Sequence, residues 1–178
     1  MKVVLISGKQ GAGKTTLADN LSNFLEYSGL GTPYLTRYAK ALYLLHDAVR
    51  DRARELGIPA NDKEGELLQW LGTEWGRNLK GQNIWVDTLL KEVAEKASDK
   101  ITIIDDCRFP NEFKAFENTS ANVLRLRLEA SSETRKDRCS YWRPNTEHPS
   151  ETSLDDYLDK FDAVIYMLPV KASLFIRH

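Results

Sequence analysis

Gly8-Lys9-Gln10-Gly11-Ala12-Gly13-Lys14-Thr15, close to the start of the chain, fits the pattern G-x-x-x-x-G-K-[ST] at every fixed position. The stretch follows a short apolar run rich in β-branched residues, Val3 to Ser7, which indicates a buried strand of a parallel sheet. A helical spacing of apolar residues follows at Leu17, Leu21 and Leu25. Because the pattern lies between a strand and a helix, it predicts a phosphate-binding loop.

The residues of this loop suit the phosphates of ATP with Mg²⁺. Glycines let backbone N–H groups turn inward at the positive end of a helix dipole, which creates an anion site. Lys14 would bridge the β- and γ-phosphates, the Thr15 hydroxyl would bind Mg²⁺, and Thr16 would bond the α-phosphate. The expected donor-binding set is Gly8, Gln10, Gly11, Ala12, Gly13, Lys14, Thr15 and Thr16. The alternatives are a plain connecting turn and a dinucleotide-binding loop, but the latter has a third glycine and no need of a lysine.

Further strands and helices alternate along the chain. Buried strands are expected at 101–104, 123–128 and 163–168, with a brief extended piece at 33–36. Helical patterns run through 42–56, 67–75 and 85–97. Strands separated by helices predict a three-layer α/β fold with a central parallel sheet, in which ligands lie at the carboxyl ends of the strands.

Composition limits what else the protein could be. The chain has 178 residues, 42% of them apolar, which suits a single domain over residues 1–178. It has 25 Lys and Arg against 26 Asp and Glu, so no global basic field predicts nucleic-acid binding. The apolar start is too short for a signal segment and no later run would span a bilayer, so we expect a cytoplasmic protein. Cys107 and Cys139 do not indicate a disulfide framework, and the sequence leaves a monomer and a homodimer open.

Two carboxylates and an arginine follow the strand at 101–104. Asp105, Asp106 and Arg108 would lie at the ligand edge of the sheet. An acid there can hold a magnesium-bound water, orient an acceptor, or fix Arg108 on a phosphate by paired hydrogen bonds. Asp105 could instead cap the following turn, where Pro110 suits the first position of a helix. We expect Thr15 and Asp105 to be the magnesium ligands.

Several blocks of the chain resemble, in order, the deoxynucleoside monophosphate kinases of tailed phages. After the phosphate-binding loop these are Leu68-Gln69-Trp70-Leu71-Gly72-Thr73-Glu74-Trp75-Gly76-Arg77, Trp85-Val86-Asp87, Asp106-Cys107-Arg108-Phe109-Pro110-Asn111-Glu112 and His148-Pro149-Ser150-Glu151. The resemblance implies a P-loop kinase fold like that of adenylate kinase, and transfer of the γ-phosphate of ATP to a (deoxy)nucleoside monophosphate. It also implies that about 38–97 forms a helical acceptor-binding insertion and about 131–150 a lid.

The chain departs from the family at two places. Lys40 stands where an acid is expected and Tyr43 where a lysine is expected. Near Tyr166 and Met167 the family tends to have an asparagine, so its adenine contact is not carried over.

The chemistry of a monophosphate acceptor agrees with the resemblance. Arg37, Arg77 and Arg108 are candidates because guanidinium groups match phosphate oxygens in pairs. Trp85 is a candidate for stacking on the acceptor base, although periodicity alone favours core packing for it. Side chains expected to read the edge of the base are Gln82, Asp106, Asn111 and Glu112.

Basic residues are concentrated in the expected lid. Arg135, Arg138 and Arg143 could close over the triphosphate and stabilise its charge, with Arg143 on ATP and the other two acting in catalysis beside Lys14 and Asp105. A helix with one basic face is the alternative. His148 is expected to have a structural role or to contact the acceptor.

The sequence is also compatible with two other functions. The Asp-x-Arg block at 106–108 would also serve a kinase of another small phosphorylated acceptor, of the phosphomevalonate type. A nucleotide-dependent switch or ATPase is less favoured, since the chain has no Asn-Lys-x-Asp motif.

Overall fold

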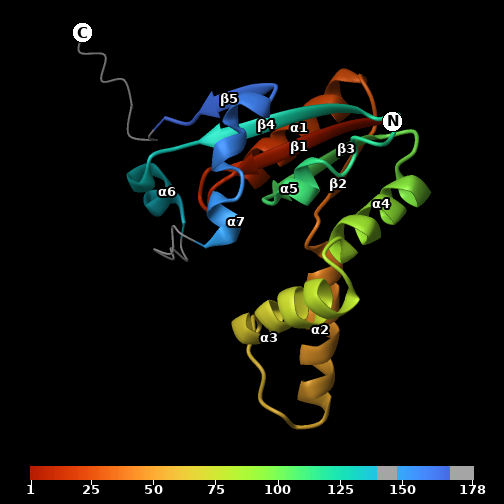
Figure 1. The fold of residues 1–178 in the computed structure, drawn as a ribbon, viewed down its shortest axis with the longest axis vertical. Helices are drawn as coiled ribbons and strands as arrows, with labels where there is room; N and C mark the ends of the chain where they lie inside the picture. Colours follow the sequence, from red (N-terminus) through yellow and green to blue (C-terminus); the bar gives the residue numbers. More distant parts are fainter. Residues whose placement is uncertain (140–147, 169–178) are drawn as a thin grey trace.

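The computed structural model describes residues 1–139 and 148–168. Five strands form one sheet in the order β2-β3-β1-β4-β5, and each neighbouring pair is parallel (Figure 1). The strands are β1 (Lys2–Gly8), β2 (Pro33–Thr36), β3 (Ile101–Cys107), β4 (Asn122–Glu129) and β5 (Ala163–Tyr166). The expected α/β fold with a central parallel sheet is confirmed, and the phosphate-binding loop leaves the middle strand.

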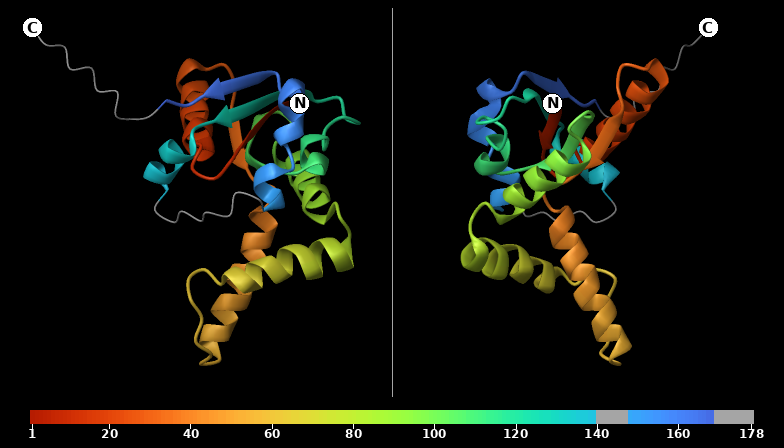
Figure 2. Two further views of the ribbon diagram at one scale, coloured as in Figure 1. Left: turned by 60° about the vertical axis from the view of Figure 1, so that its left-hand side comes forward. Right: turned by 90° about the vertical axis from the view of Figure 1, so that its right-hand side faces the viewer.

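Helices cover both faces of the sheet, which gives three layers (Figure 2). The continuous apolar run of β1 serves both layers because successive side chains point to opposite faces. Val3 and Leu5 belong to the core shared with α4 (Ile84–Lys96) and α5 (Pro110–Phe113). The neighbouring residues of β1 pack with α1 (Lys14–Ser28) on the other side. The strand is therefore buried from both directions, as its sequence predicts.

A helical arm projects from one end of the sheet (Figures 1 and 2). It consists of α2 (Lys40–Glu55), α3 (Gly65–Gln69) and the π-helix η1 (Trp70–Lys80), after which α4 returns to the sheet. The sequence predicts helices here, but the π-helix is unexpected.

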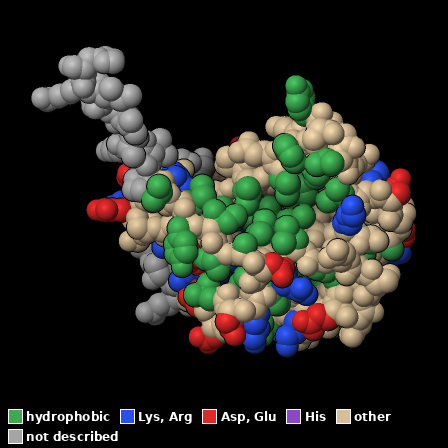
Figure 3. Space-filling model, turned by 90° about the horizontal axis from the view of Figure 1, so that it is seen from above, with side chains coloured by type: hydrophobic (Ala, Val, Ile, Leu, Met, Phe, Trp, Pro, Cys, Tyr) green, Lys and Arg blue, Asp and Glu red, His purple; other side chains and the backbone are tan. Residues whose placement is uncertain are grey.

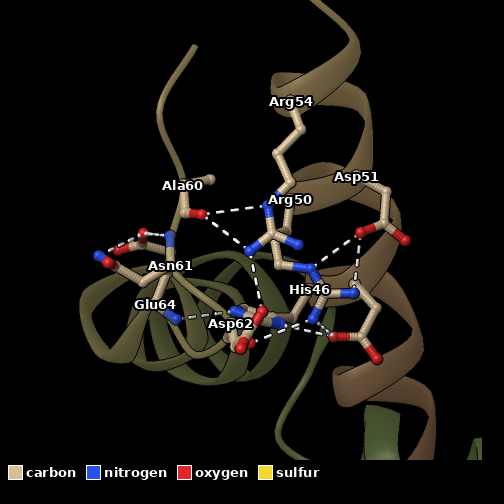
Figure 4. A network of polar contacts seen from close by, with 9 residues as sticks. His46, Arg50, Asp51, Arg54, Ala60, Asn61, Asp62 and Glu64 are labelled. Carbon is tan, nitrogen blue, oxygen red and sulfur yellow. Dashed lines mark hydrogen bonds and ion pairs between the residues drawn. The ribbon is translucent and has the colours of Figure 1, made fainter. Parts of the chain in front are cut away.

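The tip of the arm is held by a polar network (Figure 4). Arg54 of α2 donates hydrogen bonds to the Ala60 carbonyl at 2.9 Å and to Asp62 at 2.9 Å. The buried His46 ring accepts the Glu64 backbone N–H through Nε2 at 3.0 Å. These contacts fix the loop between α2 and α3 to the side of α2.

Short helices follow β4. They are α6 (Ser132–Arg138), α7 (Pro149–Thr152) and the 3₁₀-helix η2 (Asp155–Lys160). Ser131 caps α6 by accepting the Thr134 N–H at 3.1 Å. His148 caps α7 in the same way, accepting the Ser150 N–H through Nδ1 at 3.2 Å.

Apolar side chains also reach the surface. Phe24 and Tyr27 of α1, Leu124 of β4 and Tyr166 of β5 are exposed, and Figure 3 shows hydrophobic side chains gathered on the face seen from above. None of these four lines the cavity described below. Within the described ranges, no helix has the length and apolar character needed to cross a membrane.

Candidate active site

Glycines give the phosphate-binding loop its shape. Gly8, Gly11 and Gly13 have φ of 146°, 77° and 99°, a region that side-chain-bearing residues rarely adopt. A β-carbon at Gly11 would also lie 2.6 Å from the carbonyl oxygen of Arg135 in α6. The motif's glycines are thus required by backbone conformation and, at Gly11, by the close approach of α6.

Lys14 is buried at the start of α1. Its ammonium donates to the carbonyl oxygens of Gly8 at 2.7 Å and Lys9 at 3.0 Å, so it lies folded against its own loop. Burial, and then the Arg108 guanidinium, lower the pKa of Lys14 to about 8, although Glu151 and nearby aspartates oppose this. An anionic ligand beside the lysine would raise this pKa and favour the charged form.

Asp105, at the end of β3, joins the phosphate-binding loop to the end of β2. The Thr15 hydroxyl donates to Asp105 Oδ2 at 2.7 Å. Arg37 donates from Nε to Oδ1 at 2.7 Å and from Nη2 to Oδ2 at 2.8 Å. The two expected magnesium ligands are thus in contact, and their oxygen atoms are of the kind that Mg²⁺ prefers. The donor set suits a magnesium ion, but both Asp105 oxygens accept hydrogen bonds from Arg37, so Asp105 could bind the metal only after Arg37 leaves.

Asp106 supports the backbone next to Arg37. Its carboxylate accepts the N–H groups of Tyr38 at 2.8 Å and Ala39 at 3.0 Å, immediately before α2. Burial raises the pKa of Asp106, while these two hydrogen bonds oppose the shift. Although Asp106 lines the cavity, its oxygens hold the turn that presents Arg37.

Glu151 of α7 connects the loop to Arg108. One carboxylate oxygen accepts the Gln10 backbone N–H at 2.7 Å, and the other pairs with Arg108 Nη1 at 2.5 Å. This role was not predicted, because Gln10 and Glu151 are 141 residues apart in the chain. The signal in the sequence was the His148-Pro149-Ser150-Glu151 block, whose proline marks the start of a helix.

A cavity of about 830 Å³ brings most of these groups together. It spans the phosphate-binding loop, the ends of β2 and β3, and α6. Of the predicted residues it is lined by Gln10, Gly11, Gly13, Lys14, Thr15, Thr16, Arg37, Asp105, Asp106, Arg108 and Arg138. Ala39, Tyr43 and Met167 also line it and were not predicted as site residues. A smaller cavity of about 380 Å³ adjoins it, sharing Arg37, Tyr43 and Asp105.

Another group of predicted acceptor residues lies outside this cavity. The Arg77 guanidinium stacks 4.6 Å from the centre of the Phe109 ring and lies 3.7 Å from Glu112. Glu112 accepts the backbone N–H groups of Arg108 and Phe109 at 2.8 and 3.1 Å, and burial raises its pKa to about 7. Asn111 donates to the Gln82 carbonyl at 3.2 Å. Of these residues, Glu112 contacts Arg108 directly, through the Arg108 backbone N–H.

Trp85 is a packing residue, which corrects the expectation that it stacks on an acceptor base. Its side chain is buried, and its indole N–H donates to the Gly72 carbonyl at 3.0 Å. Gly76 lies against the ring, where a β-carbon would come within 2.5 Å of it. The apolar periodicity of α4, which favoured packing, identified the role that the structure shows.

The arginines of the expected lid differ in placement. Arg135 is buried and donates to the Gln10 carbonyl at 3.2 Å. Arg138 lines the cavity and donates to the Leu168 carbonyl at 2.8 Å. Arg143 lies outside the described residues.

Comparison with known proteins places this site among P-loop proteins. The model of the AAA domain family matches residues 4–155. The chain is 26% identical over 174 residues to a phosphomevalonate kinase of Drosophila melanogaster, covering 93% of this chain and 87% of that protein. It is 24% identical over 151 residues to the deoxynucleoside-5'-monophosphate kinase of Escherichia phage T5, covering 81% of this chain and 56% of the phage enzyme. Shikimate kinase from Aquifex aeolicus superposes with a TM-score of 0.48 at 15% identity, over 96% of this chain and 87% of that one.

Proposed function

We propose, from the premise that the chain belongs to the AAA domain family, that it transfers the γ-phosphate of ATP to a (deoxy)nucleoside monophosphate. The observation that carries the proposal is the shared cavity, which is lined by the phosphate-binding loop and, at the ends of β2 and β3, by Arg37 and Arg108. A loop that binds one phosphate chain, opposite guanidinium groups that bind another phosphate, suits phosphoryl transfer between two phosphorylated ligands.

The donor would be held by the phosphate-binding loop and by the part of the cavity wall that Met167 and Arg138 form. Backbone N–H groups and Lys14 would bind the β- and γ-phosphates. Met167 and Arg138 lie close to Gly13: a β-carbon at Gly13 would be 3.7 Å from the Met167 side chain and 4.0 Å from the Arg138 side chain. They are candidates for the nucleoside end of ATP. Magnesium would be held by Thr15 and Asp105 and would neutralise negative charge on the triphosphate.

The acceptor phosphate would be bound by Arg37 and Arg108. An oxygen of that phosphate would attack the γ-phosphorus in line, the bond to the β–γ bridging oxygen would break, and ADP would leave. The chain's contribution is positioning and charge stabilisation more than proton transfer. In this proposal the arm within 38–97 binds the rest of the acceptor, and the segment at 131–150 acts as a lid.

A second candidate is a kinase of another small phosphorylated acceptor. The similarity to phosphomevalonate kinase, which covers 93% of this chain, favours it. The two arginines would serve either acceptor. The nucleotide is supported by Tyr43, whose partly exposed ring lines the cavity and could stack on a base.

A panel of acceptors tests the proposal. Purified protein with ATP and Mg²⁺ is assayed for ADP release with each common NMP and dNMP, with phosphomevalonate, and with no acceptor, and the product is identified by mass. Phosphorylation of a nucleotide at a rate well above acceptor-free hydrolysis is expected. Lys14→Met is the negative control. Turnover of phosphomevalonate but of no nucleotide would select the second candidate, and hydrolysis unaffected by any acceptor would reject both.

A further inference from the structure

Glu151 uses both carboxylate oxygens to join two separate parts of the site. Oε2 accepts the backbone N–H of Gln10 in the phosphate-binding loop, and Oε1 pairs with Arg108 beyond the end of β3. Arg108 Nη1 also lies 3.4 Å from the Ser150 carbonyl, so α7 contacts the guanidinium twice. A single side chain thus connects the proposed donor loop to a proposed acceptor arginine.

The surroundings make this more than a surface ion pair. The Glu151 side chain is 12% exposed and that of Arg108 is 30% exposed. Exposed pairs contribute little, but a carboxylate this well buried needs both of its charged or polar partners. Each oxygen has one, which fixes the direction in which Arg108 approaches the loop.

Glu151 also offsets repulsion between two cations. Arg108 lowers the pKa of Lys14, after the larger effect of burial, and Glu151 raises it. The carboxylate is therefore close enough to both cations to reduce their mutual repulsion. Without the Glu151 carboxylate, the repulsion between Arg108 and Lys14 would favour positions of the guanidinium farther from the loop.

We propose that Glu151 is a positioning residue, which holds Arg108 against the phosphate-binding loop so that its other N–H donors face the acceptor phosphate. The inference rests on the proposed function, and it adds a residue that acts on the acceptor through Arg108. One Arg108 nitrogen is occupied by Glu151, while the guanidinium still lines the cavity. The Arg108 guanidinium is therefore already oriented before the acceptor binds, so less conformational entropy is lost on binding.

Glu151→Gln is the decisive variant, because it keeps the size of the side chain but removes the charge. Its amide would turn a donor toward either the Gln10 N–H or Arg108, so one of the two contacts is lost. We expect kcat/KM for the acceptor to fall about tenfold or more, with KM for ATP changed by less than about threefold. Thr152→Ala is the matched control and should behave as the wild type. Thr152 lies in the same short helix, but its hydroxyl donates to the His148 carbonyl and not to Arg108 or to the phosphate-binding loop.

A double-mutant cycle tests whether Glu151 acts through Arg108. In an Arg108→Ala background, Glu151→Gln should cause little further loss, because the group it positions is already gone. Losses that multiply would overturn the proposal. So would tighter ATP binding in Glu151→Gln, since that would make the carboxylate a competitor of phosphate.

A spectroscopic readout separates this inference from the proposed function. In ¹⁵N-labelled protein, the Arg108 Nε–H signal, assigned with Arg108→Ala, should be sharp and slowly exchanging in the wild type and averaged in Glu151→Gln. An unchanged signal would overturn the positioning role even in an active enzyme. An inactive wild type with a fixed Arg108 signal would instead reject the proposed function alone.

Discussion

At the scale of single residues, Lys14 shows how burial can lower the pKa of a lysine that is proposed to bind phosphate. Its ammonium donates to carbonyl oxygens of its own loop, and burial, followed by the nearby Arg108, lowers its pKa to about 8. A bound triphosphate would favour the charged form. Affinity for ATP should therefore depend on pH in a range where most lysines do not titrate.

We expect the affinity for ATP to fall as pH rises through about 8, by up to about tenfold per pH unit, because neutral Lys14 loses its attraction for phosphate. Calorimetric titration between pH 6.5 and 9.5 measures this. Lys14→Met should bind ATP more weakly at pH 7 and lose the dependence near pH 8. A variant with the same slope as the wild type would show that another group titrates.

Tyr43→Ala tests whether the acceptor carries a base. Stacking on an aromatic ring contributes about 1–3 kcal/mol per base, so KM for a nucleotide acceptor should rise roughly tenfold while KM for ATP stays close to the wild-type value. Tyr43→Phe keeps the ring and should retain the wild-type KM. An unchanged KM in Tyr43→Ala would place the base elsewhere in the arm.

The sequence could predict those site residues that belong to a local pattern. Lys14 and Thr15 are set by the loop motif, and Asp105 by its place at the end of a buried strand next to β1. Glu151 could not be placed, because its contact depends on how the chain returns from α6 to the loop. The role of Trp85 was ambiguous, since an aromatic residue on the apolar stripe of a helix can either pack in the core or stack on a ligand.

At the scale of elements, η1 depends on glycine. A β-carbon at Gly76 would lie 2.5 Å from the Trp85 ring and 2.7 Å from the Leu71 carbonyl, neither of which can move easily. We expect Gly76→Ala to lower the free energy of unfolding by about 1–3 kcal/mol through overpacking. Urea denaturation measures it.

The matched control for Gly76 is Gly72 in the same helix. A β-carbon there would meet the end of the flexible Leu42 side chain at 3.2 Å, so Gly72→Ala should cost much less. If the two alanine variants were equally stable, the packing of Trp85 on Gly76 would not be what fixes η1.

Strands were easier to predict than the arm. The apolar runs at 101–104 and 123–128 lie within β3 and β4, and the extended piece at 33–36 is β2. A π-helix has no distinct side-chain signature in the sequence. The contacts of this one are with Trp85 of α4, which donates to the Gly72 carbonyl and lies against Gly76. The four-residue helices α5 and α7 are too short for periodicity to reveal, and only their prolines mark them.

At the scale of the whole molecule, Glu112 should make stability depend on pH. Burial raises its pKa from 4.5 to about 7 in the folded protein. Between these values the folded state keeps a proton that the unfolded state has lost, so stability decreases as pH rises through this range. The side chain is only 5% exposed, and the shift corresponds to roughly 3 kcal/mol at most.

Chemical denaturation of the wild type and of Glu112→Gln from pH 4.5 to 8 checks this. The difference in unfolding free energy between the two proteins should change across the range in favour of the variant as pH rises. Parallel profiles would mean that Glu112 is already ionised without penalty. Because Glu112 holds the Arg108 backbone, acceptor use should respond in the variant as well.

The pair between Arg37 and Asp105 has a consequence for the order in which ligands are used. Both oxygens of the carboxylate that would hold magnesium are taken by an arginine that is half exposed and can leave. In the proposed reaction, an arriving acceptor phosphate would offer Arg37 another anion and would release Asp105 for the metal. A protein built in this way would hydrolyse ATP slowly while no acceptor is present. The metal site would be completed only when the second substrate binds.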